Sequence, residues 1–320
     1  MLGYWLMAAG MLSTCLLSDG APPPEYTVVS LERPPLMSGA VENDPVWQSV
    51  RPECNFSVYN SGGKAAVRKT VLKAGYDNRA LYIAVICLEP QMETLKTAGG
   101  DLGALWLDDS IEIFIDCGYD GFFHFIVNAA GKRYNEYRYG GYQTDNAVLA
   151  GWQAVVRCTE KNWSAEIVIP WVLLRCNPAN VQTLGFNVGR NAAVIGETSS
   201  WSSLPDSFHE ATAWGRLKLV PPLRNPVAGI EFTAACLRYD WQELKRHWET
   251  EPDPFYRQFR TRYAASITEL EKMLSGHMTE AVLLAARKQY QQLQQAEADF
   301  DADRGTETNR ELLSTLEKQP

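Results

Sequence analysis

The chain has 320 residues, of which 46% are hydrophobic, and a formal net charge of -8. This length exceeds one ordinary domain and predicts two, and the apolar fraction is enough to build a core, which excludes wholesale disorder. Lysine and arginine are scattered singly, so the sequence offers no clustered basic surface and nucleic-acid binding is excluded.

The N-terminus predicts export. Residues 2–17 are almost entirely apolar or small and carry no charge, and the run is short for a membrane span but typical of a signal peptide. We therefore expect residues 1–20 to be a signal and the protein to be secreted or held at the cell surface. Leu12–Cys15 is close to a bacterial lipobox, so a lipid anchor at Cys15, free secretion and a short anchor or misassigned start all stay open.

Residues 21–40 are predicted to be a linker, because Ala21–Pro24 forms a stiff, proline-rich spacer. The cysteines beyond Cys15 show no C-x-x-C spacing that would indicate a metal site. They are interpreted either as buried free thiols or as disulfides of an exported protein, with Cys158 and Cys176 as a pair that could meet.

Residues 41–220 alternate strand-like runs with turn signals. The expected strands are Val67–Ala74, Ala80–Cys87, Ser110–Asp116, Phe122–Asn128, Arg133–Tyr139, Trp152–Cys158, Trp163–Pro170, Leu184–Asn191 and Trp214–Val220. Short β-branched and aromatic runs without a long helix between them favour an all-β antiparallel sandwich, jelly-roll-like.

The last part of the chain changes to helical periodicity. After a linker at 221–238, residues 239–320 are expected to form an α-helical hairpin or small bundle. Apolar residues recur from Phe255 to Leu274, Gly276 is placed to end that helix, and Thr279 to cap the next. A break at Arg304–Gly305 predicts a third short helix over Asn309–Lys318. The sequence leaves open whether this tail packs on the sandwich, mediates assembly with a partner or folds separately.

The most distinctive segment is Trp106–Asp116. In a strand, Ile111, Ile113 and Ile115 would face the core, while Glu112 and its alternating neighbours would face the other way. This second face carries two carboxylates, Glu112 and Asp116, which predict either a solvated surface or a ligand surface. A tryptophan just upstream could stack on the apolar face of a sugar while Glu112 accepts hydroxyl hydrogen bonds.

This segment resembles the signature of the family 9 carbohydrate-binding modules, a DOMON-like group of β-sandwiches. Seven further elements resemble the family pattern in the same order: Asp44–Trp47, Leu81–Val85, Phe125–Asn128, Trp163–Trp171, Leu184–Val188, Ser200–Ser202 and Trp214–Leu217. Together they cover about Val41 to Val220. The resemblance implies a non-catalytic sugar-binding sandwich.

The resemblance also implies binding residues. Family members hold a terminal sugar between two aromatic rings, which match Trp106 and Phe208, with His209 beside the second, and the family's glutamate matches Glu112. The remaining polar contacts are not kept. The family's arginine falls on Ile126 and its glutamine on Gly189. The adjacent Arg190 is a ligand-binding candidate only if a bulge turns it towards that face.

No cofactor is predicted beyond a structural calcium ion, which related modules use. Asp108, Asp109 and Asp116 are the candidates for it, although no calcium-loop motif is present. Haem binding, known in some DOMON domains, would need an axial histidine or methionine, and His124 is the one strand candidate.

Three functions stay open. The first is carbohydrate binding by an exported module that serves polysaccharide capture or degradation. The second is a glycoside hydrolase, or an accessory to one, that uses Glu112 with Glu166 or Asp116. Glu166 is otherwise expected to make a structural hydrogen bond. The third is a structural protein with a degenerate sugar site whose helical tail engages a partner or a second copy.

Overall fold

The computed structural model describes residues 22–99, 102–139, 143–145, 151–205, 207–220, 223, 227–250 and 254–316. The predicted signal peptide and the anchor candidate Cys15 lie outside these residues. Within them, no helix combines the length and the apolar character that a membrane crossing requires.

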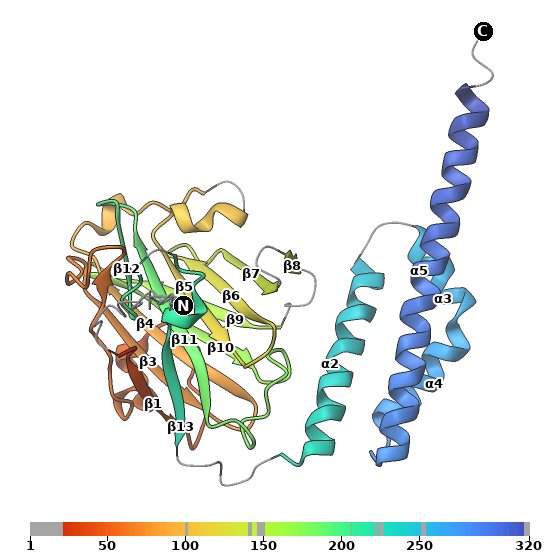
Figure 1. Ribbon diagram of the computed structural model, residues 1–320, viewed down its shortest axis with the longest axis horizontal. Helices are drawn as coiled ribbons and strands as arrows, with labels where there is room; N and C mark the ends of the chain where they lie inside the picture. The colour runs from red at the N-terminus through yellow and green to blue at the C-terminus, as the bar shows by residue number, and fades with distance from the viewer. Residues whose placement is uncertain are drawn as a thin grey trace, which may run out of the picture.

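Residues 25–220 fold as a β-sandwich (Figure 1). Its strands are β1 (Glu25–Ser30), β2 (Ser57–Val58), β3 (Thr70–Tyr76), β4 (Ala80–Leu88), β5 (Ser110–Asp116), β6 (Gly121–Asn128), β7 (Arg133–Tyr139), β8 (Gln143–Asp145), β9 (Gln153–Cys158), β10 (Asn162–Pro170), β11 (Thr183–Ala192), β12 (Glu197–Ser200) and β13 (Gly215–Val220). Short helices lie between them: η1 (Val41–Asn43), α1 (Pro45–Gln48), η2 (Met92–Thr94), η3 (Leu102–Leu107) and η4 (Ala211–Ala213).

The strands follow the order β8-β7-β6-β5-β11-β13-β1-β3-β4-β10-β9, with β12 and β2 joined at the end of β11. The predicted antiparallel sandwich is confirmed with one difference: β1 pairs in parallel with both β13 and β3. β1 thereby connects the two halves of the sandwich.

The linker prediction for residues 21–40 is wrong where β1 forms. Tyr26 and Val28 are buried in the main core while Glu25 and Thr27 are exposed, the period-2 alternation of a half-buried strand. The prolines at 22–24 end just before this strand, so the spacer covers only the first part of the segment.

The central strand β5 separates the core from the candidate site. Ile111, Ile113 and Ile115 point into the main hydrophobic core. On the opposite face, Glu112 and Phe114 are also buried. The helix η3 covers this half of the sheet, together with Leu204, Phe208 and Trp214. The second face of the strand is therefore a covered surface rather than a solvated one.

Of the two alternatives for Cys158 and Cys176, the structure has free thiols and no disulfide between them. Cys158 is an exposed free thiol at the end of β9, whereas Cys176 is a buried free thiol in the main core. Cys176 instead contacts Cys117, and this hydrogen bond together with burial raises the pKa of the Cys117 thiol.

The predicted helical region is confirmed, with different boundaries. Its helices are α2 (Gly229–Thr250), α3 (Pro254–Arg262), α4 (Ala264–Ser275) and α5 (Glu280–Leu316). Since α2 begins at Gly229, the linker expected over 221–238 is shorter than predicted. Thr279 caps α5 through a hydrogen bond from Val282 N. The break expected at Arg304–Gly305 is absent, because one interior glycine costs a helix only about 1 kcal/mol.

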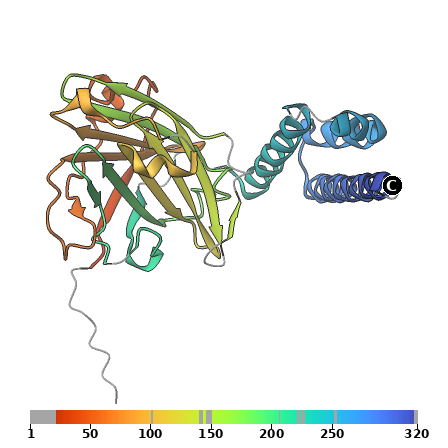
Figure 2. The same ribbon diagram turned by 90° about the horizontal axis from the view of Figure 1, so that it is seen from above.

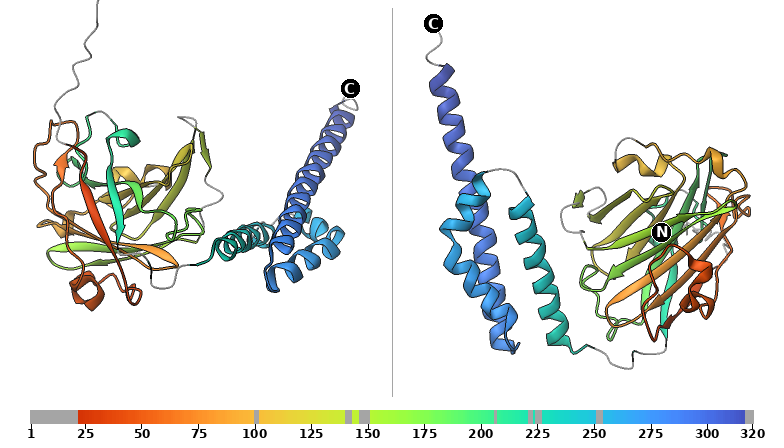
Figure 3. Two further views of the ribbon diagram at one scale, coloured as in Figure 1. Left: turned by 60° about the horizontal axis from the view of Figure 1, so that its bottom comes forward. Right: turned by 180° about the vertical axis from the view of Figure 1, so that it is seen from behind.

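The helix α2 connects the two parts of the molecule. Phe232 enters the main core of the sandwich, and Asp240 forms an ion pair with Arg175. The other face of α2 carries Trp241 and Trp248 into a second core shared with α3, α4 and α5. Figure 2 shows α2 between the sandwich and the remaining helices, and Figure 3 shows the end of α5 extending beyond its neighbours.

Candidate functional site

A cavity of about 410 Å³ opens on the outer face of the sheet, over β5, β6, β7 and β11. Four of the predicted site residues contribute to it. The lining residues are Tyr59, Trp106, Glu112, His124, Ile126, Tyr134, Glu136, Arg138, Asn191, Thr198, Ser207, Phe208 and His209. One wall and the mouth are therefore aromatic, while the floor is charged and polar.

Trp106 lies at the end of η3, immediately before β5, and its side chain is 51% exposed. The helix η3 packs over β5, β6 and β7, which fixes the tryptophan at the edge of the cavity. A large apolar ring that is half exposed beside a cavity, rather than buried in the core, is available to a ligand.

Phe208 forms the second aromatic surface. Its ring packs against Tyr59 and Phe114 at centroid distances of 5.3 and 5.9 Å, and Trp214 Nε1 donates a hydrogen bond to its carbonyl oxygen at 2.8 Å. A Cβ added at Gly189 would lie only 3.1 Å from Phe208 Cζ. A side chain at Gly189 would therefore require the Phe208 ring to shift by a few tenths of an ångström.

The floor of the cavity is a buried row of three ionisable groups. His124 Nε2 donates to Glu112 Oε2 at 2.8 Å, and its Nδ1 donates to Glu136 Oε1 at 3.1 Å. Asn191 donates to the other oxygen of Glu112 at 2.7 Å. The imidazole of His124 stacks on Phe114, with ring centroids 4.3 Å apart.

The three groups favour the charged forms of one another. Burial alone would lower the pKa of His124, but its hydrogen bonds to the two carboxylates outweigh burial and raise it. Burial alone would raise the pKa of both glutamates, but the hydrogen bonds from His124 outweigh the effect of burial. The pKa of Glu112 is therefore lowered, and that of Glu136 is lowered to about 2. The row is therefore a carboxylate–imidazolium–carboxylate arrangement.

Glu136 has further partners on its own strand. Arg138 Nε donates to Oε1 and the Tyr134 hydroxyl donates to Oε2. All three residues lie on one face of β7, two positions apart, and His124 is the register partner of Glu136. These residues supply polar groups on the sheet face where the family's arginine would have stood at Ile126.

His209 lies on the loop before η4, beside this row. Its ring centroid is 5.6 Å from that of His124 and 6.0 Å from that of Phe122. Burial, with the nearby positive charges of Arg138 and His124, lowers the pKa of His209 to about 4. The imidazole is therefore neutral at pH 7.

The prediction that Arg190 binds a ligand is wrong. Arg190 is fully buried on the core side of β11, and its guanidinium donates to the carbonyls of Lys69 and Leu88 at 2.9 and 3.1 Å. It also lies 3.6 Å from the buried carboxylate of Glu89. No bulge turns the side chain outwards, so the period of the strand places it on the face opposite the cavity.

The three calcium candidates do not form one site. Asp108 accepts hydrogen bonds from Gly99 N and the Asn128 amide, and Asp109 accepts one from Lys96 N. Asp116 lies at the far end of β5, about 23 Å along the strand from Asp109. The contacts of Asp108 and Asp109 are those of side chains that fix the loop before β5.

Sequence reasoning missed most of the polar floor. His124, Tyr134, Glu136, Arg138 and Asn191 come from three strands, and the distances between strands are not visible in the sequence. The sequence did carry one signal of this floor: the polar residues Tyr134, Glu136 and Arg138 alternate along one strand, which places them on the same face of the sheet. His124, which the sequence offered only as a candidate axial haem ligand, lies between the carboxylates of Glu112 and Glu136.

A β-sandwich with an aromatic, charge-lined cavity on one sheet defines a small-ligand binding module. The model of the family "Carbohydrate family 9 binding domain-like" matches residues 38–221, and the chain belongs to this family. Domains of this family are non-catalytic binding modules. A comparison with curated proteins found no match.

Three solved structures are similar to this chain, and one of them reaches a TM-score at which it supports the fold. A putative carbohydrate-binding protein from Bacteroides uniformis ATCC 8492 matches with a TM-score of 0.50 and 18% identity over 61% of this chain and 98% of that one. A family 9 carbohydrate-binding module from Caldicellulosiruptor kristjanssonii matches at 19% identity in its complexes with cellotriose and glucose, with TM-scores of 0.48 and 0.49. These matches cover 65% and 64% of this chain and 99% and 100% of those.

Proposed function

We propose that the sandwich binds carbohydrate without catalysis, holding a terminal sugar against Trp106 and Phe208 above the charged floor. The observation that carries this proposal is the half-exposed Trp106, which shares one cavity with Phe208 and with the carboxylates of Glu112 and Glu136. A pyranose has apolar C–H faces that pack on rings and a polar rim that needs hydrogen-bond partners.

Glu112 can serve as an acceptor although both of its oxygens already have partners, because each carboxylate oxygen carries two lone pairs. The hydroxyl of Tyr134, the guanidinium of Arg138 and the amide of Asn191 lie around the same cavity. In this proposal they replace the arginine and glutamine of the family pattern. The cavity of about 410 Å³ falls within the roughly 300–1,000 Å³ of small-molecule sites.

We also propose that the protein acts outside the cell, either secreted or at its surface, in polysaccharide capture or degradation. The support is the apolar, uncharged segment at 2–17 and the lipobox-like sequence that ends at Cys15. A lipid on Cys15 would hold the module at a membrane surface, whereas cleavage without lipidation would release it.

The hydrolase alternative gains no support from the pairs that the sequence suggested. Glu166 lies on the outer face of the opposite sheet, where it accepts hydrogen bonds from Ser38 N, Gly39 N and Trp47 Nε1. The structural role expected for Glu166 is therefore confirmed. Asp116 is four residues from Glu112 along β5, about 13 Å, beyond the roughly 5–10 Å that glycosidase carboxylates span.

Assembly through the helical tail stays a prediction. The described aromatic residues of the tail are buried or partly buried, either in its own core or against the sandwich. They are therefore already engaged within one chain.

The sugar site is tested by Trp106→Ala. A glycan array first identifies a gluco-oligosaccharide that the wild-type protein binds. We expect the affinity of the variant for this ligand to be about 10- to 100-fold lower, because the loss of one aromatic ring from the contact costs about 1.5–3 kcal/mol. Isothermal titration calorimetry measures the change.

Tyr119→Ala is the matched control, because Tyr119 is similarly exposed, at 48%, but lies at the opposite end of β5. It should leave the affinity unchanged. Undiminished binding by a folded Trp106→Ala variant would show that the sugar does not bind at this cavity.

A further inference from the structure

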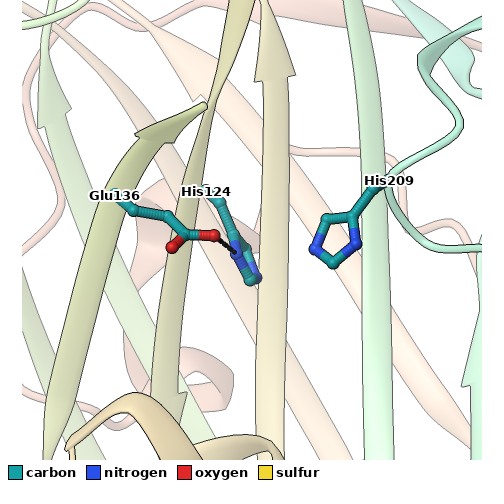
Figure 4. Close-up of side chains that lie close together, drawn as sticks. All are labelled: His124, Glu136 and His209. Atoms are coloured by element: carbon teal, nitrogen blue, oxygen red, sulfur yellow. Dashed lines mark hydrogen bonds and ion pairs between the residues drawn. The ribbon is translucent and has the colours of Figure 1, made fainter. Parts of the chain in front are cut away.

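Three side chains at the cavity floor have the chemistry of a metal site. His124, Glu136 and His209 each offer one ligand atom, and these atoms all lie within 4.8 Å of one another. They come from β6, from β7 and from the loop before η4, respectively. Figure 4 shows Glu136 and His209 on either side of His124.

The spacing is close to that of a coordination sphere. Three atoms no more than 4.8 Å apart share a centre at most about 2.8 Å from each (4.8 Å divided by √3), compared with roughly 2.0–2.2 Å for bonds from zinc to histidine or carboxylate. Inward movements of about 0.8 Å or less would therefore complete the site. His209 lies on a loop, which can supply part of that movement.

The surrounding hydrogen bonds suit such a site. Glu112 holds Nε2 of His124 at 2.8 Å, which leaves Nδ1, the nitrogen that faces Glu136 at 3.1 Å, as the ligand atom. A histidine that ligates a metal through one nitrogen usually donates from the other to a carboxylate, a backbone carbonyl or water. The Tyr134 hydroxyl donates a hydrogen bond to Oε2 of Glu136 at 3.0 Å, and this bond orients the carboxylate ligand.

His209 has its ring turned towards this centre. Among the described residues, its imidazole nitrogens have no hydrogen-bond partner. Two imidazoles and one carboxylate select a first-row transition ion or zinc, because calcium and magnesium prefer ligand sets of oxygen only. With three protein ligands, a fourth position would remain for water or a ligand oxygen on the cavity side.

We propose that His124 Nδ1, Glu136 and His209 bind one zinc-class divalent ion at the floor of the cavity. The ion takes the position of the proton between His124 and Glu136, and that proton leaves to solvent. The site does not depend on sugar binding, although the two ligands would share the cavity.

Calorimetric titration of untagged, metal-stripped protein with zinc chloride tests the proposal. We expect one ion per chain with micromolar or tighter affinity, and a loss of at least 10-fold in His209→Ala and in Glu136→Gln. Replacement by Co²⁺ should give visible absorption bands that both variants lose.

His277→Ala is the matched control, because His277 is an exposed histidine on the helical tail. It should leave the affinity and the stoichiometry unchanged. The proposal is overturned if the wild-type protein binds no zinc at about 100 µM, or if a folded His209→Ala variant binds zinc as tightly as the wild type. Circular dichroism confirms folding, and His209→Ala keeps the test decisive even if the change at the buried Glu136 disturbs the fold.

Discussion

The variant His124→Leu is expected to lose about 3–5 kcal/mol of stability at pH 6, because it leaves two buried carboxylates without their shared cation. Glu112 and Glu136 are only 5% and 3% exposed, so water in the cavity can replace the imidazolium only in part. Glu136 keeps Arg138 as a partner, whereas Glu112 keeps only the neutral amide of Asn191. Urea unfolding in the presence of EDTA, which removes any metal, measures the loss.

Neutralising the stranded carboxylate should recover part of this loss. We expect His124→Leu combined with Glu112→Gln to be more stable than His124→Leu alone by about 1–2 kcal/mol. A loss below about 1 kcal/mol in the single variant, or no recovery in the double variant, would contradict the ionic arrangement at the cavity floor.

The same arrangement predicts the pH dependence of the difference between wild type and His124→Leu. The raised pKa of His124 gives stability that is fully present below its ordinary value of 6.5 and is lost as the pH rises through the raised value. The lowered pKa values of Glu112 and Glu136 give stability that is present above 4.5 and is lost as the pH falls.

The difference should therefore be greatest between pH 4.5 and 6.5 and smaller at pH 9. His209 acts with the opposite sign, since its lowered pKa costs stability as the pH falls from 6.5 towards 4. It is present in both proteins, so most of its contribution cancels. Unfolding curves at pH 5.5 and pH 9 check this prediction, which a difference that grows with pH would contradict.

Arg190→Met should also cost about 3–5 kcal/mol, because it removes a fully buried guanidinium that interacts with the buried carboxylates of Glu89 and Asp109. Glu89 keeps Arg68 as a partner, at 3.0 Å, whereas Asp109 loses this cation. Glu89 lies 3.6 Å from Arg190, and one oxygen of the buried Asp109 has no hydrogen-bond partner among the described residues. The variant also removes the donors to the carbonyls of Lys69 and Leu88. Thermal and urea unfolding measure the effect.

Arg216→Met, an exposed arginine on the neighbouring strand β13, is the control and should change stability by no more than about 0.5 kcal/mol. Arg190→Met should leave the aromatic surfaces of the cavity in place, because Arg190 faces the core. Near-wild-type stability of Arg190→Met would show that the guanidinium is dispensable to the core.

Much of the sandwich could be predicted because its signals are local. The strand Ser110–Asp116 has the predicted bounds, and Arg133–Tyr139 does as well, since alternation every second residue reports directly on a strand with two different faces. The helical tail was predictable from its apolar spacing for the same reason. β1 was missed because its six residues follow a proline-rich segment and pair only with strands distant in the sequence.

Of the candidate site, the sequence by itself determined Trp106 and Glu112, which lie in the segment Trp106–Asp116, and the aromatic residue Phe208. These positions match a family pattern. Only the tertiary structure decided the floor of the cavity. The partners of His124 lie 12 residues away on either side, on β5 and β7, and strand register is what brings both carboxylates to its two nitrogens. Register also places Arg190 in the core, since neighbouring residues of a strand point to opposite faces whatever their charge.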